Sequence, residues 1–130
     1  MKFNPLAEVA GKRVVVVDDS IVRGNTTRQI VRMLFDAGAA EVHVRVSAPP
    51  VFGQCFYGID LADPAEMIAH DKSVDEIRDY IGATSLAYLS HDGLVAATRR
   101  PENELCRACL TGNYPTAVPA QSGKLRFEVV

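Results

Sequence analysis

The sequence lacks an apolar run that could cross a membrane and lacks an excess of either charge. A membrane-spanning helix needs about 20 consecutive apolar residues, and the first five residues, MKFNP, have no apolar core of a signal peptide. The 130 residues carry a net charge of −2, so there is no overall field for nucleic acid or for an anionic membrane. We therefore expect neither nucleic acid nor a membrane as a partner.

Cysteine is scarce and its number is odd. The three cysteines are Cys55, Cys106 and Cys109. An odd number argues against the disulfide framework of a small secreted domain. Internal repeats and low-complexity tracts are absent from the sequence as well. These features predict a cytoplasmic chain of one compact domain, whose cysteines serve metal binding or redox chemistry.

The most informative segment is residues 14–27, which read VVVVDDSIVRGNTT. The unbroken valine run is typical of a parallel strand that is covered on both faces. Ligands of parallel sheets bind beyond the carboxyl ends of the strands, where Asp18 and Asp19 stand. The hydroxyls, the glycine and the amide groups of the helix that follows suit a phosphate group. Carboxylates can bind sugar hydroxyls or a metal ion. Because Asp18 and Asp19 stand next to a segment suited to phosphate, the sequence predicts a sugar-phosphate site.

The hydrophobic pattern predicts an α/β domain. Strands are expected over residues 13–18, 41–47 and 85–89, and helices over 27–37, 63–69, 74–81 and 92–97. The first strand, first helix and second strand should form a β-α-β unit with a right-handed crossover. From residue 99 the chain is polar and is expected to be a loop, with a linker near 99–105; the pattern does not place 124–130.

Residues 14–27 resemble the phosphoribosyl diphosphate (PRPP) motif of type I phosphoribosyltransferases, which is an apolar strand, two acids and then Thr-Gly-x-Thr. Here Arg23 precedes Gly24, and Asp-Asp-Ser-Ile-Val-Arg-Gly is the form found in the glutamine PRPP amidotransferase family. Other segments resemble the C-terminal part of that family, in its order, up to about Thr116. They are residues 2–5, 42–50, 55–60, 73–77, 85–90 and 106–112.

The resemblance implies a fold and a reaction. Residues 1–98 would be the second half of a type I phosphoribosyltransferase domain, with its parallel PRPP-binding sheet, and 99–130 a cysteine-bearing tail. The family transfers ammonia from glutamine to PRPP, which gives 5-phosphoribosylamine and diphosphate in the first step of purine synthesis. Asp18 and Asp19 would face the ribose and Mg²⁺. The residues around the 5′-phosphate would be Ser20, Arg23, Gly24, Asn25, Thr26 and Thr27.

The family's glutaminase domain, with its nucleophilic cysteine, has no counterpart in this sequence. The first half of the transferase domain has none either, so we assign no catalytic residue. We expect the isolated chain to be inactive, with PRPP and purine nucleotides as its ligands and a homo-oligomer as the full-length form.

The pair Cys106-x-x-Cys109 allows three interpretations from the residues alone: a redox dithiol, half of a zinc site or half of an iron–sulfur site. The resemblance favours a 4Fe–4S cluster, because Cys55, Cys106 and Cys109 match three of the ligands that some family members carry. The fourth ligand has no counterpart in this chain. The remaining alternative is that all three are small buried apolar residues.

Two other functions fit parts of the pattern. The chain could be a module that binds PRPP or a nucleotide without turnover. Residues 14–20 also resemble the start of a receiver domain, in which two acids hold Mg²⁺ and an aspartate at the end of a later strand accepts a phosphoryl group. Asp60 lies at a suitable distance along the chain, but residues 55–59 are a poor strand. A plain solvated strand end is the last alternative for Asp18 and Asp19.

Overall fold

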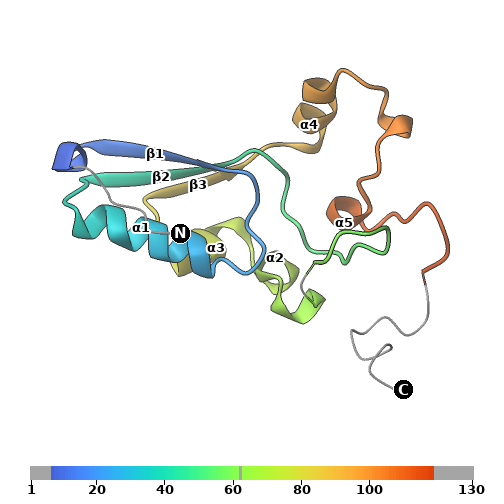
Figure 1. Cartoon of the computed structure of the whole chain (residues 1–130), viewed down its shortest axis with the longest axis horizontal. Coiled ribbons are helices and arrows are strands. Elements are labelled where there is room, and N and C mark those ends of the chain that lie inside the picture. The colour runs from blue at the N-terminus through green and yellow to red at the C-terminus, as the bar shows by residue number, and fades with distance from the viewer. Residues whose placement is uncertain (1–6, 62, 119–130) are drawn as a thin grey trace.

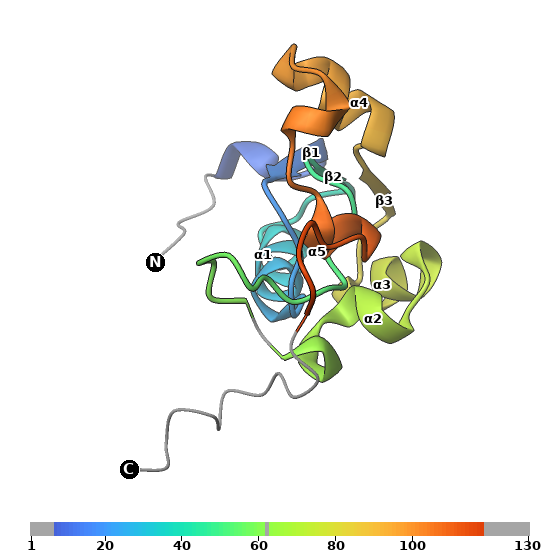
Figure 2. The ribbon, with the colours of Figure 1, turned by 90° about the vertical axis from the view of Figure 1, so that its right-hand side faces the viewer.

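The computed structural model describes residues 7–61 and 63–118, and its centre is a sheet of three parallel strands. The strands lie in the order β1 (Arg13–Asp18), β2 (Glu41–Val46) and β3 (Ser85–Tyr88) (Figure 1). The two longer helices of the β-α-β connections, α1 (Asn25–Asp36) and α3 (Val74–Ile81), lie on the same side of this sheet (Figure 2). The α/β fold and its parallel pairing are as expected from the sequence.

The shorter elements lie mostly toward the carboxyl ends of the strands. Figure 1 shows α4 and α5 beyond these ends, on the side where the chain leaves β1 and β2. The elements besides those named above are η1 (Ala7–Val9), η2 (Pro64–Glu66), α2 (Ile68–Asp71), α4 (His91–Thr98), η3 (Glu102–Glu104) and α5 (Ala108–Thr111). None of the helices in 7–61 and 63–118 is long and apolar enough to cross a membrane.

One face of the sheet forms the main core. Val42, Val44 and Val46 of β2 point to this face and pack with Ile77 and Ile81 of α3, all of them buried. On the opposite face of β1, Val15 and Val17 are 61% and 73% exposed. The expectation that the valine run is covered on both faces is therefore wrong for the structure described here. The reason is topological, since α1 and α3 cover the same face and β1 is an edge strand.

The helix from Ser73 follows its sequence signals closely. The side-chain oxygen of Ser73 accepts from the Glu76 amide, while the Glu76 carboxylate accepts from the Ser73 amide, which makes a capping box. Gly82 ends α3 in the left-handed region at φ 73°. Both ends of this helix are thus determined by local side-chain chemistry.

The helix expected over 63–69 is instead divided in two. Met67 is buried and extended (φ −79°, ψ 120°), and it separates η2 from α2. The amide of Ile68 donates to the carbonyl of Val22 at 2.8 Å, so a contact with a distant segment replaces a helical hydrogen bond.

Other boundaries differ less. Helix α1 begins at Asn25, before the expected position, and α4 extends over His91–Thr98. Short helices at Glu102–Glu104 and Ala108–Thr111 occur where a loop was expected. Residues 124–130 lie outside the described part of the chain. The handedness of the crossover stays a prediction.

Candidate functional site

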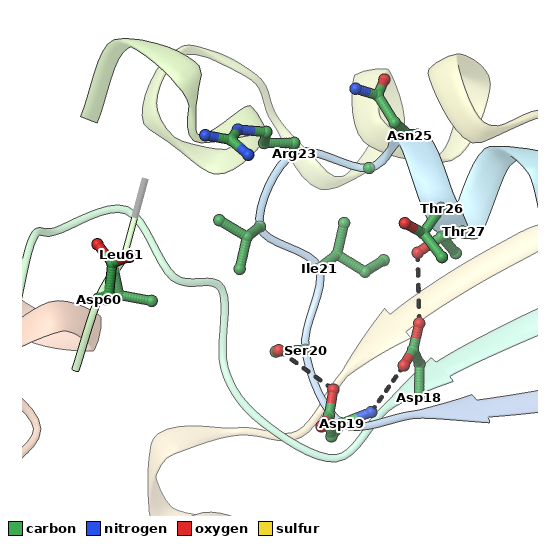
Figure 3. A pocket seen from close by; sticks show the side chains of 12 residues that line it. Asp18, Asp19, Ser20, Ile21, Arg23, Asn25, Thr26, Thr27, Asp60 and Leu61 are labelled. Atoms are coloured by element: carbon green, nitrogen blue, oxygen red, sulfur yellow. Dashed lines mark hydrogen bonds between the residues drawn. The ribbon is translucent and has the colours of Figure 1, made fainter. Parts of the chain in front are cut away.

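The loop between β1 and α1 lines a cavity of about 550 Å³ at the carboxyl edge of the sheet. Every residue of the expected sugar-phosphate site lies along its wall. The lining residues are Asp18, Asp19, Ser20, Ile21, Val22, Arg23, Gly24, Asn25, Thr26, Thr27, Asp60 and Leu61 (Figure 3). The strand β1 and the helix α1 that follows it place the consecutive residues 18–27 around one cavity.

The two adjacent carboxylates have different partners. Asp18 is the last residue of β1, and its Oδ2 accepts a hydrogen bond from the hydroxyl of Thr27 at 3.3 Å. Its Oδ1 accepts from the amide of Asp19 at 3.0 Å. Asp19 is exposed, and its Oδ1 accepts from the hydroxyl of Ser20 at 3.2 Å. One acid is therefore held against α1, while the other lies in the loop (Figure 3).

Gly24 makes the sharp turn into α1. It has φ 77°, a left-handed conformation that favours glycine. Space is limited as well, because an added Cβ would lie 2.9 Å from Cδ1 of Ile68 and 3.3 Å from Cε1 of Tyr80. The loop backbone is thus packed directly against α2 and α3.

The start of α1 is suited to an anion. Among the residues that the structure describes, no side chain caps this end, and the first turn contains no acidic residue. Amide groups at a helix start lack partners within the helix and carry the positive end of its dipole. Thr26 is exposed at this point, while Thr27 is buried. A phosphate group would meet amide and hydroxyl donors here.

Arg23 carries the positive charge of the loop, and it already has a partner. Its guanidinium forms an ion pair with Glu66 of η2, through Nε at 3.0 Å and through a second, shorter contact of Nη2. Both side chains are about half exposed. An anion in the cavity would therefore compete with Glu66 for Arg23.

Asp60 and Leu61 complete the cavity from a segment distant in sequence. Figure 3 shows them across the cavity from Asp18. Sequence reasoning did not include them in the site, although residues 55–60 resembled the family. Asp60 does not end a strand, so the receiver-like arrangement is wrong on this point.

The pair of aspartates offers the ligands that Mg²⁺ prefers. Mg²⁺ is commonly held by one or two carboxylates together with water and substrate phosphates, without a full protein cage. Over residues 7–61 and 63–118 there is no cluster of three or more acidic, histidine or cysteine side chains that could hold a metal ion. The oxygen donors of Asp18 and Asp19 nevertheless fit Mg²⁺ in a site completed by substrate.

The segments that carry Cys55 and Cys109 meet outside the cavity lining. The carbonyl of Cys109 in α5 accepts from the amides of Phe52 and Gly53, at 3.2 and 3.0 Å, which brings it beside the segment of Cys55. The hydroxyl of Tyr114 donates to the carbonyl of Gln54 at 2.7 Å and strengthens this contact. Segments up to 60 residues apart in sequence are therefore joined here.

The surroundings of Cys109 alter the acidity of its thiol. Burial raises the pKa of Cys109, and the nearby Cys55 and Cys106 raise it further. All three are free thiols, of which Cys106 is exposed. Soft thiolate donors suit an iron–sulfur cluster, but three of them are one fewer than the usual four. Over residues 7–61 and 63–118 the cysteines do not form a group that could hold a metal ion, although Cys55 and Cys106 lie near enough to affect the pKa of Cys109.

Comparisons with known proteins agree with this geometry. The chain is 51% identical over 133 residues to the amidophosphoribosyltransferase of Synechococcus elongatus, which covers 100% of this chain and 27% of the relative. It is 50% identical over 124 residues to the amidophosphoribosyltransferase of Archaeoglobus fulgidus, covering 93% of this chain and 27% of the relative.

A solved structure is also similar. The glutamine PRPP amidotransferase of B. subtilis, complexed with ADP and GMP, has a TM-score of 0.81 and 51% identity, covering 88% of this chain and 26% of its own. No model of a protein family matches the chain. The chain spans about a quarter of the length of the curated relatives it matches. In sequence and fold together, nearly the whole chain matches about a quarter of amidophosphoribosyltransferases from several organisms.

Proposed function

We propose that this chain is the PRPP-binding part of an amidophosphoribosyltransferase. The whole enzyme would transfer ammonia from glutamine to C1 of PRPP, releasing diphosphate and forming 5-phosphoribosylamine. The observation that carries the proposal is the single cavity that joins the Asp18–Asp19 pair to the start of α1. A site for a sugar phosphate needs both parts within the length of one ligand.

Each part of the cavity has a role in this proposal. Asp18 and Asp19 bind the ribose hydroxyls and Mg²⁺. The hydroxyl of Ser20 and the donors of the loop and of α1 surround the 5′-phosphate. They are contributed by Arg23, Gly24, Asn25, Thr26 and Thr27. Gly24 allows the backbone to approach the phosphate closely.

Catalysis at such a site depends on orientation and on charge stabilisation. The hydroxyls of Thr27 and Ser20 hold the two carboxylates in defined positions before the ligand arrives. When bound, Mg²⁺ supplies positive charge that stabilises the leaving diphosphate. The chain's own contribution is the fixed geometry around the ribose and its phosphate.

The tail would hold part of a 4Fe–4S cluster in the full-length enzyme. Cys55, Cys106 and Cys109 supply three ligands, and the fourth comes from outside this chain. We place the boundary between the transferase half, 1–98, and the tail, 99–130. The two parts share a small core in which Leu110 of the tail packs against Val51 and Met67.

Purine nucleotides are proposed as further ligands, because the similar B. subtilis enzyme is complexed with ADP and GMP. We also propose a homo-oligomer for the full-length enzyme, a cytoplasmic location, and neither nucleic acid nor a membrane as a partner.

Titration calorimetry with PRPP and Mg²⁺ tests the site. The double variant Asp18→Asn with Asp19→Asn should lose most of the Mg²⁺-dependent binding and should keep the circular dichroism spectrum of the parent chain. Asp92→Asn is the matched control, since this exposed carboxylate lies in α4 outside the cavity lining. Unchanged binding in the double variant would refute the proposal.

Turnover provides a second test. The isolated chain should release no diphosphate from PRPP with glutamine or with ammonium, because it spans about a quarter of its relatives. Removing part of a catalytic site costs more than the sum of its contacts. Steady release above the uncatalysed rate would show that this part is a complete catalyst.

A further inference from the structure

We propose that Tyr80 of α3 is a positioning residue for the phosphate loop and acts through the side chain of Asn25. This inference rests on the sugar-phosphate site proposed above and adds to it a residue from outside the motif. Tyr80 does not line the cavity of about 550 Å³, whereas Asn25 does. The side chains of Tyr80 and Asn25 are in direct contact.

The contact is a hydrogen bond with a defined direction. The hydroxyl of Tyr80 donates to Oδ1 of Asn25 at 2.7 Å. An asparagine side chain has one acceptor oxygen and one NH₂ donor group. Because Tyr80 engages the oxygen, the NH₂ group remains for a ligand in the cavity. An anion needs this orientation, since the reversed side chain would turn its carbonyl dipole toward negative charge.

The ring of Tyr80 supports the same loop. Its Cε1 lies 3.3 Å from the position that a Cβ on Gly24 would take, so the ring lies behind the turn that begins α1. The guanidinium carbon of Arg28, one turn along α1, lies 5.1 Å from the ring centroid. A cation over an aromatic face is an attractive arrangement. Hydroxyl, ring and cation together hold α3 against the first turn of α1.

The hydroxyl and the ring therefore have separable roles. The ring packs against the loop and would be retained in phenylalanine. The hydroxyl selects one orientation of the Asn25 side chain before a ligand binds, which reduces the ordering cost of binding. Tyr80→Phe removes only this second contribution.

The first experiment is a double-mutant cycle on PRPP affinity, measured by titration calorimetry in the presence of Mg²⁺. Tyr80→Phe should weaken binding roughly three- to tenfold, the effect of one hydrogen bond. In an Asn25→Ala background the same change should have no further effect, because the side chain through which it acts is absent. Equal losses in both backgrounds would show a general structural role and would overturn the proposal.

The matched control is Tyr57→Phe. Its hydroxyl also bonds a side chain, Thr116 at 3.1 Å, but it lies outside the cavity lining. This variant should bind PRPP as the parent chain does. A loss in Tyr57→Phe equal to that in Tyr80→Phe would also overturn the proposal.

The second experiment needs no ligand. The side-chain NH₂ signals of Asn25 in a ¹⁵N-labelled chain, assigned by their loss in Asn25→Asp, should shift in Tyr80→Phe and stay unchanged in Tyr57→Phe. Signals that do not respond to Tyr80→Phe would overturn the proposal. If the parent chain fails to bind PRPP, the proposed function fails and this inference with it. If the parent binds PRPP and Tyr80→Phe binds equally well, only the inference fails.

Discussion

The hydroxyl of Thr27, in the first turn of α1, donates a hydrogen bond of 3.3 Å to the carboxylate of Asp18 at the end of β1. Thr27 is 3% exposed, so this contact joins the end of β1 to the first turn of α1 from the protein side of the loop. Both residues also line the cavity. The position of one proposed ligand-binding acid thus depends on a buried residue of the same motif.

Thr27→Val should lower the free energy of unfolding by about 1 kcal/mol, because a partly buried hydrogen bond to a carboxylate is lost while the side-chain shape is kept. Mg²⁺-dependent PRPP binding should weaken as well, since Asp18 is less well held. Urea denaturation and calorimetry measure the two effects. Thr26→Val, at the exposed neighbouring position, should leave stability within about 0.5 kcal/mol of the parent. Equal stability of both variants would contradict the role given to the Thr27 hydroxyl.

Gly24→Ala should destabilise the chain by roughly 2 kcal/mol, through backbone strain and a steric clash. Gly82→Ala separates the two causes, because Gly82 has a similar φ of 73° but nothing within 4 Å of an added Cβ. It should cost only about 1 kcal/mol. The change Ile68→Val removes the Cδ1 that an added Cβ on Gly24 would meet at 2.9 Å. The loss of unfolding free energy caused by Gly24→Ala should therefore be smaller in an Ile68→Val background. An equal loss in both backgrounds would contradict the steric clash.

Tyr88→Phe should be neutral or stabilising at pH 7, because the buried Tyr88 hydroxyl has no hydrogen-bond partner among residues 7–61 and 63–118. Burial raises the pKa of Tyr88 to about 12 from its ordinary 10. Below pH 10 both folded and unfolded states keep the proton. Between pH 10 and about 12 only the unfolded state loses it, so the stability contribution of Tyr88 is lost as pH rises through this window.

Thermal unfolding measured from pH 8 to 11 tests this. The unfolding temperature of the parent chain should fall more steeply with rising pH than that of Tyr88→Phe. Tyr114→Phe is the contrasting variant, since its hydroxyl donates to Gln54 and its removal should cost about 1 kcal/mol at pH 7. Parallel pH profiles for the parent and Tyr88→Phe would contradict the raised pKa.

Iodoacetamide at pH 8 should alkylate Cys106 before Cys109. The thiolate is the reactive form, and burial raises the pKa of Cys109, while Cys106 is exposed. Mass spectrometry of timed samples gives both rates, and the Cys109 rate should rise as pH increases above 8. Faster reaction at Cys109 would contradict the raised pKa of this half-buried thiol.

Iron should be absent or substoichiometric in the isolated chain purified anaerobically, because three thiols leave a 4Fe–4S cluster one ligand short. Metal analysis by mass spectrometry measures it. Stoichiometric zinc that is lost in Cys106→Ser would show instead that these cysteines form a zinc site.

Local chemistry accounts for what the sequence could predict. The helix between Ser73 and Gly82 has its start and its end encoded by neighbouring side chains, so its bounds over 74–81 are confirmed. The segment at 14–27 likewise encodes strand, loop and helix in consecutive residues, and all of its proposed ligand-binding residues line one cavity.

Contacts between distant segments decided the rest. Met67 interrupts the helix expected over 63–69 because the next amide bonds to Val22. Asp60 reaches the cavity from a loop, and Tyr80 reaches Asn25 from another helix. Val15 and Val17 look like buried strand residues in sequence, yet one face of β1 is open. Periodicity and capping report on the chain within a few residues, whereas burial and hydrogen-bond partners depend on which segments the fold brings together.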